Sequence, residues 1–538
     1  MKRRSFIQSV PVVIGGVTVN AYGASPMLSA MTSALYETDR ILVIVQLNGG
    51  NDGLNTLIPL DQYAALSLKT IRENVLIQES KVLPLAGTNG KTGLNPGLVG
   101  FQKLWDEGKL SIIQGVGYPK FSYSHFRATD IWMTGADSNE ILNSGIPGRY
   151  LAYEYPNYPV GFPNTTMPDP LAIRIGGNVG LGLQNNGVNM GISINNTKDL
   201  LNLTGSVFKD PANTATYIGK ELAYVREVQR QTDKFGDAVE LAATKGKNLS
   251  TLYPKAAANG VPAELGQALG NALSIVAKLI SGGLKTRVYW VSTGGFDTHA
   301  TQVNATDHSQ GNHTNLLKGV GDAIYAFMDD VKLLGLENRV AGLTFSEFGR
   351  RIVSNASGGT DHGAAQPMFV FGSKVNPGMV GVNPTIDPAS TANSNLPMQY
   401  DFRSIYGSIL QDWFCVPNTD IDSIMLKNYQ KLKIMDDGNC LPTSIHDYNA
   451  AAGENLVYAY PNPFVDRTKI KFETKGGHTL IQIIDNQGTV IDTLVDSYLA
   501  PGKYDVSCDM EMVPSGIYYV RLQNEQIQQV KSMMKVKG

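Results

Sequence analysis

Five short apolar runs constrain the fold of this chain more than any other feature. Each is rich in β-forming residues, and the first four lead into a polar or glycine-rich loop. They are residues 40–53, 110–126, 286–299, 339–349 and 366–372. Continuous apolar runs of this length are typical of strands that are covered on both faces, as in a parallel sheet.

Segments with helical spacing of apolar residues lie between these runs, at 95–109, 262–281 and 315–335. Alternating strands and helices predict an α/β fold whose sheet is mostly parallel and flanked by helices. Ligands of such sheets bind at the carboxyl ends of the strands. We therefore expect the polar loops after the first four runs to form a functional site.

Composition narrows the class of protein. The 538 residues are 42% hydrophobic and 17% charged, with a formal net charge of −2 and 56 glycines. This mix predicts a folded, loop-rich protein of several domains. A nearly neutral chain without a basic, aromatic-interleaved stretch is not expected to bind nucleic acid. Residues 136–260 are rich in Asn, Gly and Pro and are interpreted as an insertion or cap over the site.

The first thirty residues have the layout of a signal peptide. Arg3 and Arg4 precede a short apolar stretch, and small residues follow at 21–25. The arginine pair resembles a twin-arginine export signal, and an ordinary secretory signal is the alternative. The apolar stretch is too short for a confident membrane span, and no later run reaches 18 apolar residues, so the mature chain is expected to lack a transmembrane segment.

A break in composition separates the main domain, predicted at 38–445, from a different C-terminal region. A linker at 446–456 is followed by short alternating strands over 457–538, with a hairpin turn at 486–488. This pattern predicts a small β-sandwich. Residues 460–464, 515–519 and 531–537 resemble the sorting domain of type IX secretion, which implies a cell-surface or secreted protein that contacts the secretion machinery. A general immunoglobulin-like binding module is the alternative.

The three cysteines, Cys415, Cys440 and Cys508, include no C-x-x-C pair, so a thiolate zinc site is not expected. Cys415 and Cys440 could form a disulfide in an oxidising compartment, although spacing alone does not decide this.

Two clusters contain acids beside imidazoles. Asp297 and His299 follow an apolar run, and Asp361 and His362 are adjacent in a glycine-flanked loop. Carboxylate and imidazole are suitable ligands for zinc, manganese or similar ions. Glu347 is a further candidate ligand or a carboxylate that holds a ligand from outside the metal site. For Asp297 and His299 the alternative is a carboxylate that caps the loop and an imidazole in contact with solvent.

Two further loops contain candidate groups. Asp52 lies in the glycine-rich loop 48–53, where it could bind metal or where backbone N–H groups could bind an anion. Ser124 is the first candidate nucleophile and Ser122 the second, with turn-forming serines as the alternative, and the neighbouring His125 is a candidate catalytic residue. Arg127 and Arg350, with Arg351 as a neighbour, are candidates to hold a tetrahedral anion, and surface salt bridging is the alternative.

The motifs at 47–59, 122–135, 294–302, 346–351 and 360–372 together resemble the family called domain of unknown function 1501. That family is grouped with the alkaline-phosphatase-like hydrolases, which include sulfatases. The resemblance implies an acid after the first strand, a serine after the next, and then acid–imidazole pairs at a two-metal site. Here these positions correspond to Asp52, Ser124, Asp297 with His299, and Asp361 with His362.

These observations predict an exported metal-dependent hydrolase of phosphate or sulfate esters. Its cofactors would be zinc, manganese or calcium, its substrate a small-molecule or glycan ester, and its location the cell surface or the exterior, reached through the periplasm. The alternative is a non-catalytic surface protein that binds a glycan or a protein on the same scaffold.

Overall fold

The computed structural model describes most of the chain. The described residues are 11–14, 17–20, 39–63, 67–195, 234–258, 261–436, 457–474, 476–485, 489–524 and 528–537, with Thr216, Gly219 and Cys440. They divide into two units, 1–439 and 440–538. Most of the predicted signal peptide and the predicted hairpin turn at 486–488 lie outside the described residues. In the described part of the predicted signal peptide, strands β1 (Pro11–Ile14) and β2 (Val17–Asn20) pair antiparallel.

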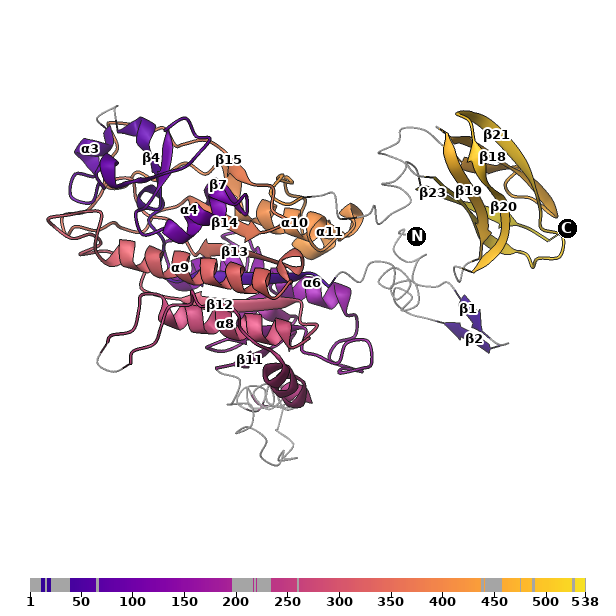
Figure 1. Cartoon of the computed structure of the whole chain (residues 1–538), viewed down its shortest axis with the longest axis horizontal. Coiled ribbons are helices and arrows are strands. Elements are labelled where there is room, and N and C mark those ends of the chain that lie inside the picture. Colours follow the sequence, from indigo (N-terminus) through magenta and orange to yellow (C-terminus); the bar gives the residue numbers. More distant parts are fainter. Residues whose placement is uncertain are drawn as a thin grey trace. The chain divides into compact units, whose positions relative to one another are not determined.

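A nine-stranded sheet forms the centre of the larger unit (Figure 1). Its order is β11-β8-β12-β3-β13-β14-β7-β15, and β16 also pairs with β7. In chain order the strands are β3 (Ile41–Leu47), β7 (Leu110–Gly117), β8 (Ala172–Ile175), β11 (Ile192–Ile194), β12 (Val288–Thr293), β13 (Val340–Ser346), β14 (Gln366–Gly372), β15 (Gly378–Val380) and β16 (Tyr400–Asp401). All five apolar runs contain one of these strands, and the predicted mostly parallel α/β fold is confirmed.

Strand β14 is the exception to the parallel arrangement. It runs antiparallel to both of its neighbours, β13 and β7. A parallel neighbour would need a long crossover connection, usually a helix. No helix lies between Ser346 and Gln366, all of which are described, so the chain turns back along the same edge of the sheet.

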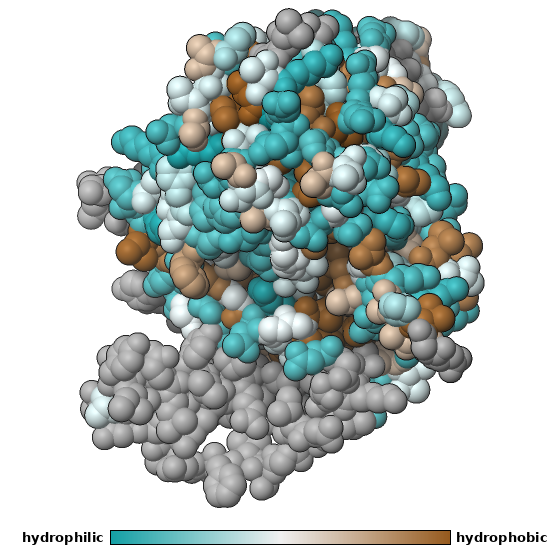
Figure 2. All heavy atoms as spheres, turned by 90° about the vertical axis from the view of Figure 1, so that its left-hand side faces the viewer, coloured by the Kyte–Doolittle hydropathy of each residue, from teal (hydrophilic) through white to brown (hydrophobic). Residues whose placement is uncertain are grey.

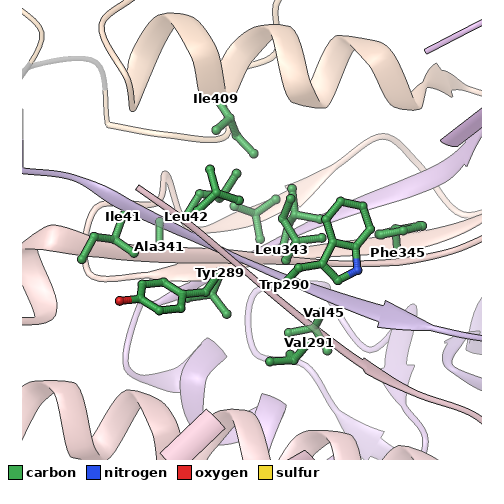
Figure 3. Packing of buried hydrophobic residues seen from close by; sticks show 14 of the residues in the cluster. Ile41, Leu42, Val45, Tyr289, Trp290, Val291, Ala341, Leu343, Phe345 and Ile409 are labelled. Atoms are coloured by element: carbon green, nitrogen blue, oxygen red, sulfur yellow. The ribbon is translucent and has the colours of Figure 1, made fainter. Parts of the chain in front are cut away.

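Helices pack on the sheet in two groups. The first comprises α5 (His125–Thr134), α6 (Ile146–Glu154), α10 (Phe402–Asp412) and α11 (Asn418–Met425), and the second comprises α4 (Val99–Asp106), α8 (Gln267–Ser281) and α9 (Asn312–Leu333). Trp132 of α5 stacks on Phe402 of α10 and on Phe345 of β13, with ring centroids 4.3 and 5.4 Å apart. Figure 3 shows Ile409 of α10 above the sheet and further helices below it. The three predicted helical segments correspond to α4, α8 and α9.

The central strands are apolar because neither face meets water. Every residue of β3 is buried, and so is every residue of β13. Figure 3 shows Val45 and Val291 on one face of the sheet and Leu343 with the Trp290 ring on the other, so both faces are covered by apolar side chains. Burial of each such side chain stabilises the fold by about 1.5–3 kcal/mol, so these strands hold the loops at their ends in fixed positions.

The region interpreted as a cap is in part an extension of the sheet, because β8 and β11 form one edge of it. The other small elements of the unit are β4 (Leu57–Pro59), β5 (Leu83–Pro84) and β6 (Thr92–Leu94), which form a sheet of their own, the pair β9 (Gln184–Asn185) and β10 (Val188–Asn189), the helix α3 (Ser67–Ile71), and the 3₁₀ turns η1 (Gly53–Asn55), η2 (Leu60–Gln62), η3 (Glu79–Lys81), η4 (Leu181–Leu183) and η6 (Glu337–Arg339).

The C-terminal unit contains two antiparallel sheets (Figure 1). One has the order β17-β18-β21 and the other β20-β19-β22-β23. Their bounds are β17 (Val457–Tyr460), β18 (Arg467–Thr474), β19 (Gly477–Ile484), β20 (Val490–Leu499), β21 (Gly502–Asp509), β22 (Gly516–Gln523) and β23 (Gln528–Lys535). Alternate residues of β18 point inward, and Ile470 and Phe472 share a core with Ile481 and Ile483 of the other sheet, as in a sandwich.

Cys415 and Cys440 are both disulfide-bonded, and Cys508 is a free, buried cysteine. Among the described residues, no helix is long and apolar enough to cross a membrane. On the face of the larger unit seen in Figure 2, hydrophobic residues form small patches separated by hydrophilic ones.

Candidate metal centre

The register of the sheet brings the polar loops together. Thr293, the last residue of β12, and Ser346, the last of β13, both pair with Leu47 at the end of β3. The loops that begin at 48, 294 and 347 therefore leave the same edge side by side. Since β14 runs in the opposite direction, the residues that precede it also lie at this edge.

Two glycines let these loops approach closely. A Cβ on Gly49, whose φ is +123°, would lie 2.3 Å from the amide nitrogen of Asp297. A Cβ on Gly359 would lie 2.4 Å from the carbonyl carbon of His299. Only glycine permits this packing of backbone against backbone, which seats Asp297 beside the first loop and the 358–363 loop beside His299.

Three imidazoles converge on the Asp297 carboxylate. The Nε2 atoms of His299 and His362 lie 3.2 and 3.1 Å from Asp297 Oδ1, and that of His125 lies 3.4 Å from Oδ2. The Nε2 atoms of His299 and His362 are 2.9 Å apart. His125, Asp297 and His362 offer ligand atoms that all lie within 4.8 Å of one another. We call these four residues the imidazole–aspartate cluster.

The outer nitrogen of each ring has an acceptor of its own. His125 Nδ1 lies 2.9 Å from Glu347 Oε1, and His299 Nδ1 lies 3.0 Å from Asp361 Oδ1. His362 Nδ1 lies 2.8 Å from the carbonyl oxygen of Tyr123. Since a carbonyl and two carboxylates can only accept, each Nδ1 carries the proton in the neutral ring.

In the neutral rings this choice of tautomer leaves each Nε2 free to bind a cation beside the Asp297 carboxylate. Unprotonated nitrogens 2.9 Å apart repel each other unless a cation lies between them. Burial lowers the pKa of His362, although its hydrogen bonds to Tyr123 and Asp297 act in the opposite direction, so this ring favours the neutral form. The donor set therefore fits a metal ion, and the acceptors at Nδ1 are the outer partners that metal-binding histidines usually have.

Arg350 positions Asp297 rather than facing the pocket. Its guanidinium is fully buried and donates to the carbonyl oxygens of Gly50, Phe296 and Thr360 and, at 2.8 Å, to Asp297 Oδ1. Burial raises the pKa of Asp297, but the hydrogen bonds from Arg350 and His362 outweigh this and lower it to about 2. The expected role of Arg350 as an anion-binding residue is corrected, because a side chain enclosed by backbone carbonyls cannot reach a ligand.

Asp52 and the glycine-rich loop, which were expected to bind a metal or an anion, instead make contacts with other residues of the protein. The Asp52 carboxylate is buried, forms an ion pair with Arg72 and accepts from Gln302 at 2.6 Å. The N–H groups of Gly49, Gly50 and Asn51 donate to Glu347 and Ser346. These N–H groups are therefore not available to an anion, and Asp52 belongs to a buried polar network behind the cluster.

The remaining residues predicted as ligands or catalytic groups lie outside the imidazole–aspartate cluster. Asp361 and Glu347 hold His299 and His125 from outside the cluster, while Arg127 donates through Nη2 to carbonyl oxygens of residues 137, 138 and 140. Ser124 precedes α5 and is exposed, and among the described residues its hydroxyl makes no hydrogen bond. The Oγ of Ser122 accepts from the Ser124 N–H at 3.2 Å.

A pocket of about 500 Å³ opens beside His125 and Glu347. Its wall consists of the loop ends Asn48, Gly49, Gly294 and Gly295 and the α5 residues Phe126, Thr129 and Asp130. A substrate in this pocket would lie directly beside the imidazole–aspartate cluster.

Sequence reasoning missed two features. It treated His125 as a catalytic group, although the structure places its ring among the potential ligands. It also missed His313 and Arg72 of the buried network. His313 Nε2 lies 3.0 Å from Asn51 Oδ1, and its residue spacing within α9 is that of the apolar face. That apolar-face position is the one signal that predicts burial for His313.

Comparisons with known proteins identify two domains. Residues 215–421 match the family described as "Protein of unknown function (DUF1501)", and residues 458–536 match "Secretion system C-terminal sorting domain". The chain contains a DUF1501 domain and a C-terminal sorting domain. The sorting domain makes it a secreted or cell-surface protein. The DUF1501 match includes every cluster residue except His125.

The structure also has similarity to solved structures. One similar structure comes from a study of glycosaminoglycan metabolism by Bacteroides thetaiotaomicron, with 9% identity, a TM-score of 0.35, and 92% of this chain and 89% of that chain covered. A Pseudoalteromonas sulfatase has 10% identity and a TM-score of 0.31, with 92% of this chain and 89% of that chain covered. A phosphonate monoester hydrolase from Silicibacter pomeroyi has 9% identity and a TM-score of 0.31, with 92% of this chain and 88% of that chain covered. No curated protein matches the sequence.

Proposed function

We propose that this secreted DUF1501 protein is a metal-dependent hydrolase of phosphate or sulfate esters. The observation that supports the proposal is the convergence of three imidazole Nε2 atoms on the Asp297 carboxylate, with each Nδ1 held by an acceptor. A metal centre needs ring nitrogens and a carboxylate that converge on one point while the outer ring nitrogens are held by acceptors, and this arrangement meets that need.

The ligands would be His125, Asp297, His299 and His362. A set of three imidazoles and one carboxylate suits zinc, whereas calcium and manganese prefer oxygen ligands, so we favour zinc and keep manganese as the second candidate. A bound divalent ion supplies Lewis acidity at the ester. Arg350 would keep Asp297 ionised and fixed, and Glu347 and Asp361 would keep two of the rings in the orientation that binds metal.

Ser124 remains our proposed nucleophile. Its hydroxyl is exposed at the first turn of α5, beside the ligand His125, and no described residue accepts or donates a hydrogen bond there. The positive end of a helix favours the charge that develops on an attacking oxygen. The serine oxygen would bond to phosphorus or sulfur while the alcohol leaves with a proton, and water would later release the inorganic anion.

The proposal is tested on the purified full chain by elemental analysis and by turnover of p-nitrophenyl phosphate and p-nitrophenyl sulfate with added zinc or manganese. We expect stoichiometric metal, and turnover that Asp297→Asn and Ser124→Ala abolish. Only Asp297→Asn should also lose the metal.

His308→Gln serves as the control, because this ring contacts the carbonyl of Leu76 at 3.0 Å and is not part of the cluster. A folded chain that binds no metal would refute the metal centre. Metal without turnover of either ester class would favour the alternative of a non-catalytic binding protein.

A further inference from the structure

The pocket beside the cluster has a wall that the metal chemistry does not explain. Helix α5 contributes Phe126, Thr129 and Asp130 to it. These positions are three and four residues apart and so share one face of the helix. The opposite face, with Ala128, Ile131 and Trp132, is buried in the core.

Phe126 is unusual on this wall. Its side chain is 87% exposed, and it makes no ring contact with another aromatic residue among those described. An exposed phenyl ring in a concave site adjacent to His125 is a surface on which a flat, partly apolar ligand can stack.

The electrostatics of the pocket exclude an anion there. None of its nine lining residues is Lys or Arg, whereas Asp130 and Glu347 carry carboxylates. The anionic end of an ester would be repelled from this wall and would face the cluster. A cationic group would be repelled by a metal ion at the adjacent cluster, so we take the group that occupies the pocket to be neutral.

Hydrogen bonding describes that neutral group further. The Asp130 carboxylate accepts and the Thr129 hydroxyl both donates and accepts, and they lie on the same helix face as the phenyl ring. Gly294 and Gly295 add wall without side chains, which leaves room for a ring of several atoms. A ligand with one C–H face and several hydroxyl groups satisfies all of these features.

We propose that this pocket binds a neutral sugar ring, which stacks on Phe126 and donates hydroxyl hydrogens to Asp130. Resting on the proposed hydrolase function, this makes the substrate a sugar ester whose anionic group faces the cluster. Phe126 and Asp130 are then the residues that determine specificity for the leaving group.

Binding of uncharged glycosides tests the pocket without turnover. The full chain is titrated with methyl glucoside, methyl galactoside, methyl mannoside and N-acetylglucosamine, and binding is followed by saturation-transfer NMR. We expect at least one of them to bind, with Kd raised roughly tenfold in Phe126→Ala and raised less in Phe126→Trp, which keeps an aromatic surface. Asp130→Asn should weaken binding as well.

Ile141→Ala is the matched control, because Ile141 is a 90% exposed apolar residue that does not line the pocket. Unchanged glycoside affinity in Phe126→Ala, or binding of phenol but of no glycoside, would overturn the proposal. If glycosides bind through Phe126 and no ester is hydrolysed, the hydrolase proposal alone fails. If methyl phosphate or methyl sulfate is hydrolysed and no glycoside binds, the sugar proposal alone fails.

Discussion

At the scale of single residues, Asp361 and Asp297 contact different nitrogen atoms of the histidine rings, and this difference decides the role of each in the proposed metal site. Asp297 meets Nε2 atoms, where a metal would bind, whereas Asp361 accepts from Nδ1 of His299 and from Asn355, each at 3.0 Å. The pair adjacent in sequence, Asp361 and His362, is thus divided between an outer and an inner role.

We predict that Asp361→Asn lowers metal affinity by about 10- to 100-fold without abolishing binding, as loss of an outer partner does. Asn can still accept from His299 Nδ1, but without the charge that strengthens the ligand. Competition with a chromophoric chelator measures the change. Complete loss of metal, equal to that in Asp297→Asn, would instead make Asp361 a direct ligand.

His313 provides a pH-dependent term in stability. Burial lowers its pKa to about 4, while nearby Asp52 opposes the shift. Between pH 6.5 and 4 the unfolded chain therefore binds a proton that the folded chain does not, so the contribution is fully present above pH 6.5 and is lost as the pH falls towards 4. We expect this term to amount to about 3 kcal/mol.

Urea unfolding of metal-free protein at pH 6.5, 5.5 and 4.5 checks this value. His313→Gln cannot titrate, so its stability should fall less steeply than that of the unmodified chain. Parallel loss in the two proteins would show that other groups cause the pH dependence.

At the scale of elements, the strands and their mostly parallel arrangement were predictable, and the direction of β14 was not. The apolar runs at 40–53 and 286–299 identify β3 and β12 because burial on both faces demands apolar residues at most positions. Nothing in the run 366–372 reveals that β14 is antiparallel, since direction depends on how the chain returns from Ser346. Because the chain turns back between Ser346 and Gln366, His362 lies in the loop that precedes β14.

Side-chain partners within the predicted site were also only partly predictable. Residue type and position in loops predicted Asp297, His299 and His362 as ligands, and the structure brings these three side chains together. The burial of Arg350 and Asp52 depends on long-range packing, such as Arg350 against the carbonyl of Gly50. Local spacing does not contain that information.

The loop that carries His362 packs closely against the backbone of His299 at Gly359. We predict that Gly359→Ala displaces this loop from His299, because its Cβ would lie 2.4 Å from backbone, and that metal affinity falls about tenfold, with a loss of about 1–3 kcal/mol in stability. Isothermal titration with zinc and urea unfolding measure the two effects.

Gly358→Ala is the matched control one residue away. Its φ of +66° imposes a strain of about 1–2 kcal/mol on alanine, but no atom lies within 4 Å of the added Cβ. Stability should fall while metal affinity is retained. Equal metal affinity in both variants would contradict the proposed role of the Gly359 contact.

At the scale of the whole molecule, the site and the sorting function reside in different units. All four cluster residues lie in the unit 1–439, and the sorting-domain match at 458–536 lies in the unit 440–538. The buried core of the C-terminal unit shares no residue with the cores of the larger one. Export and metal binding should therefore be separable by mutation.

We predict that a chain truncated after residue 456 keeps its metal but is no longer secreted or displayed by its native host. The deletion removes β17 to β23 and with them the C-terminal core, while each ligand keeps its own partners in the larger unit. Fractionation with immunodetection locates the protein, and elemental analysis of the truncated chain measures its metal. Asp297→Asn in the full chain should give the converse result, normal export without metal. A truncated chain that reaches the surface as efficiently as the full one would mean that the sorting signal lies within the larger unit, and loss of metal on truncation would mean that the two units depend on each other to fold.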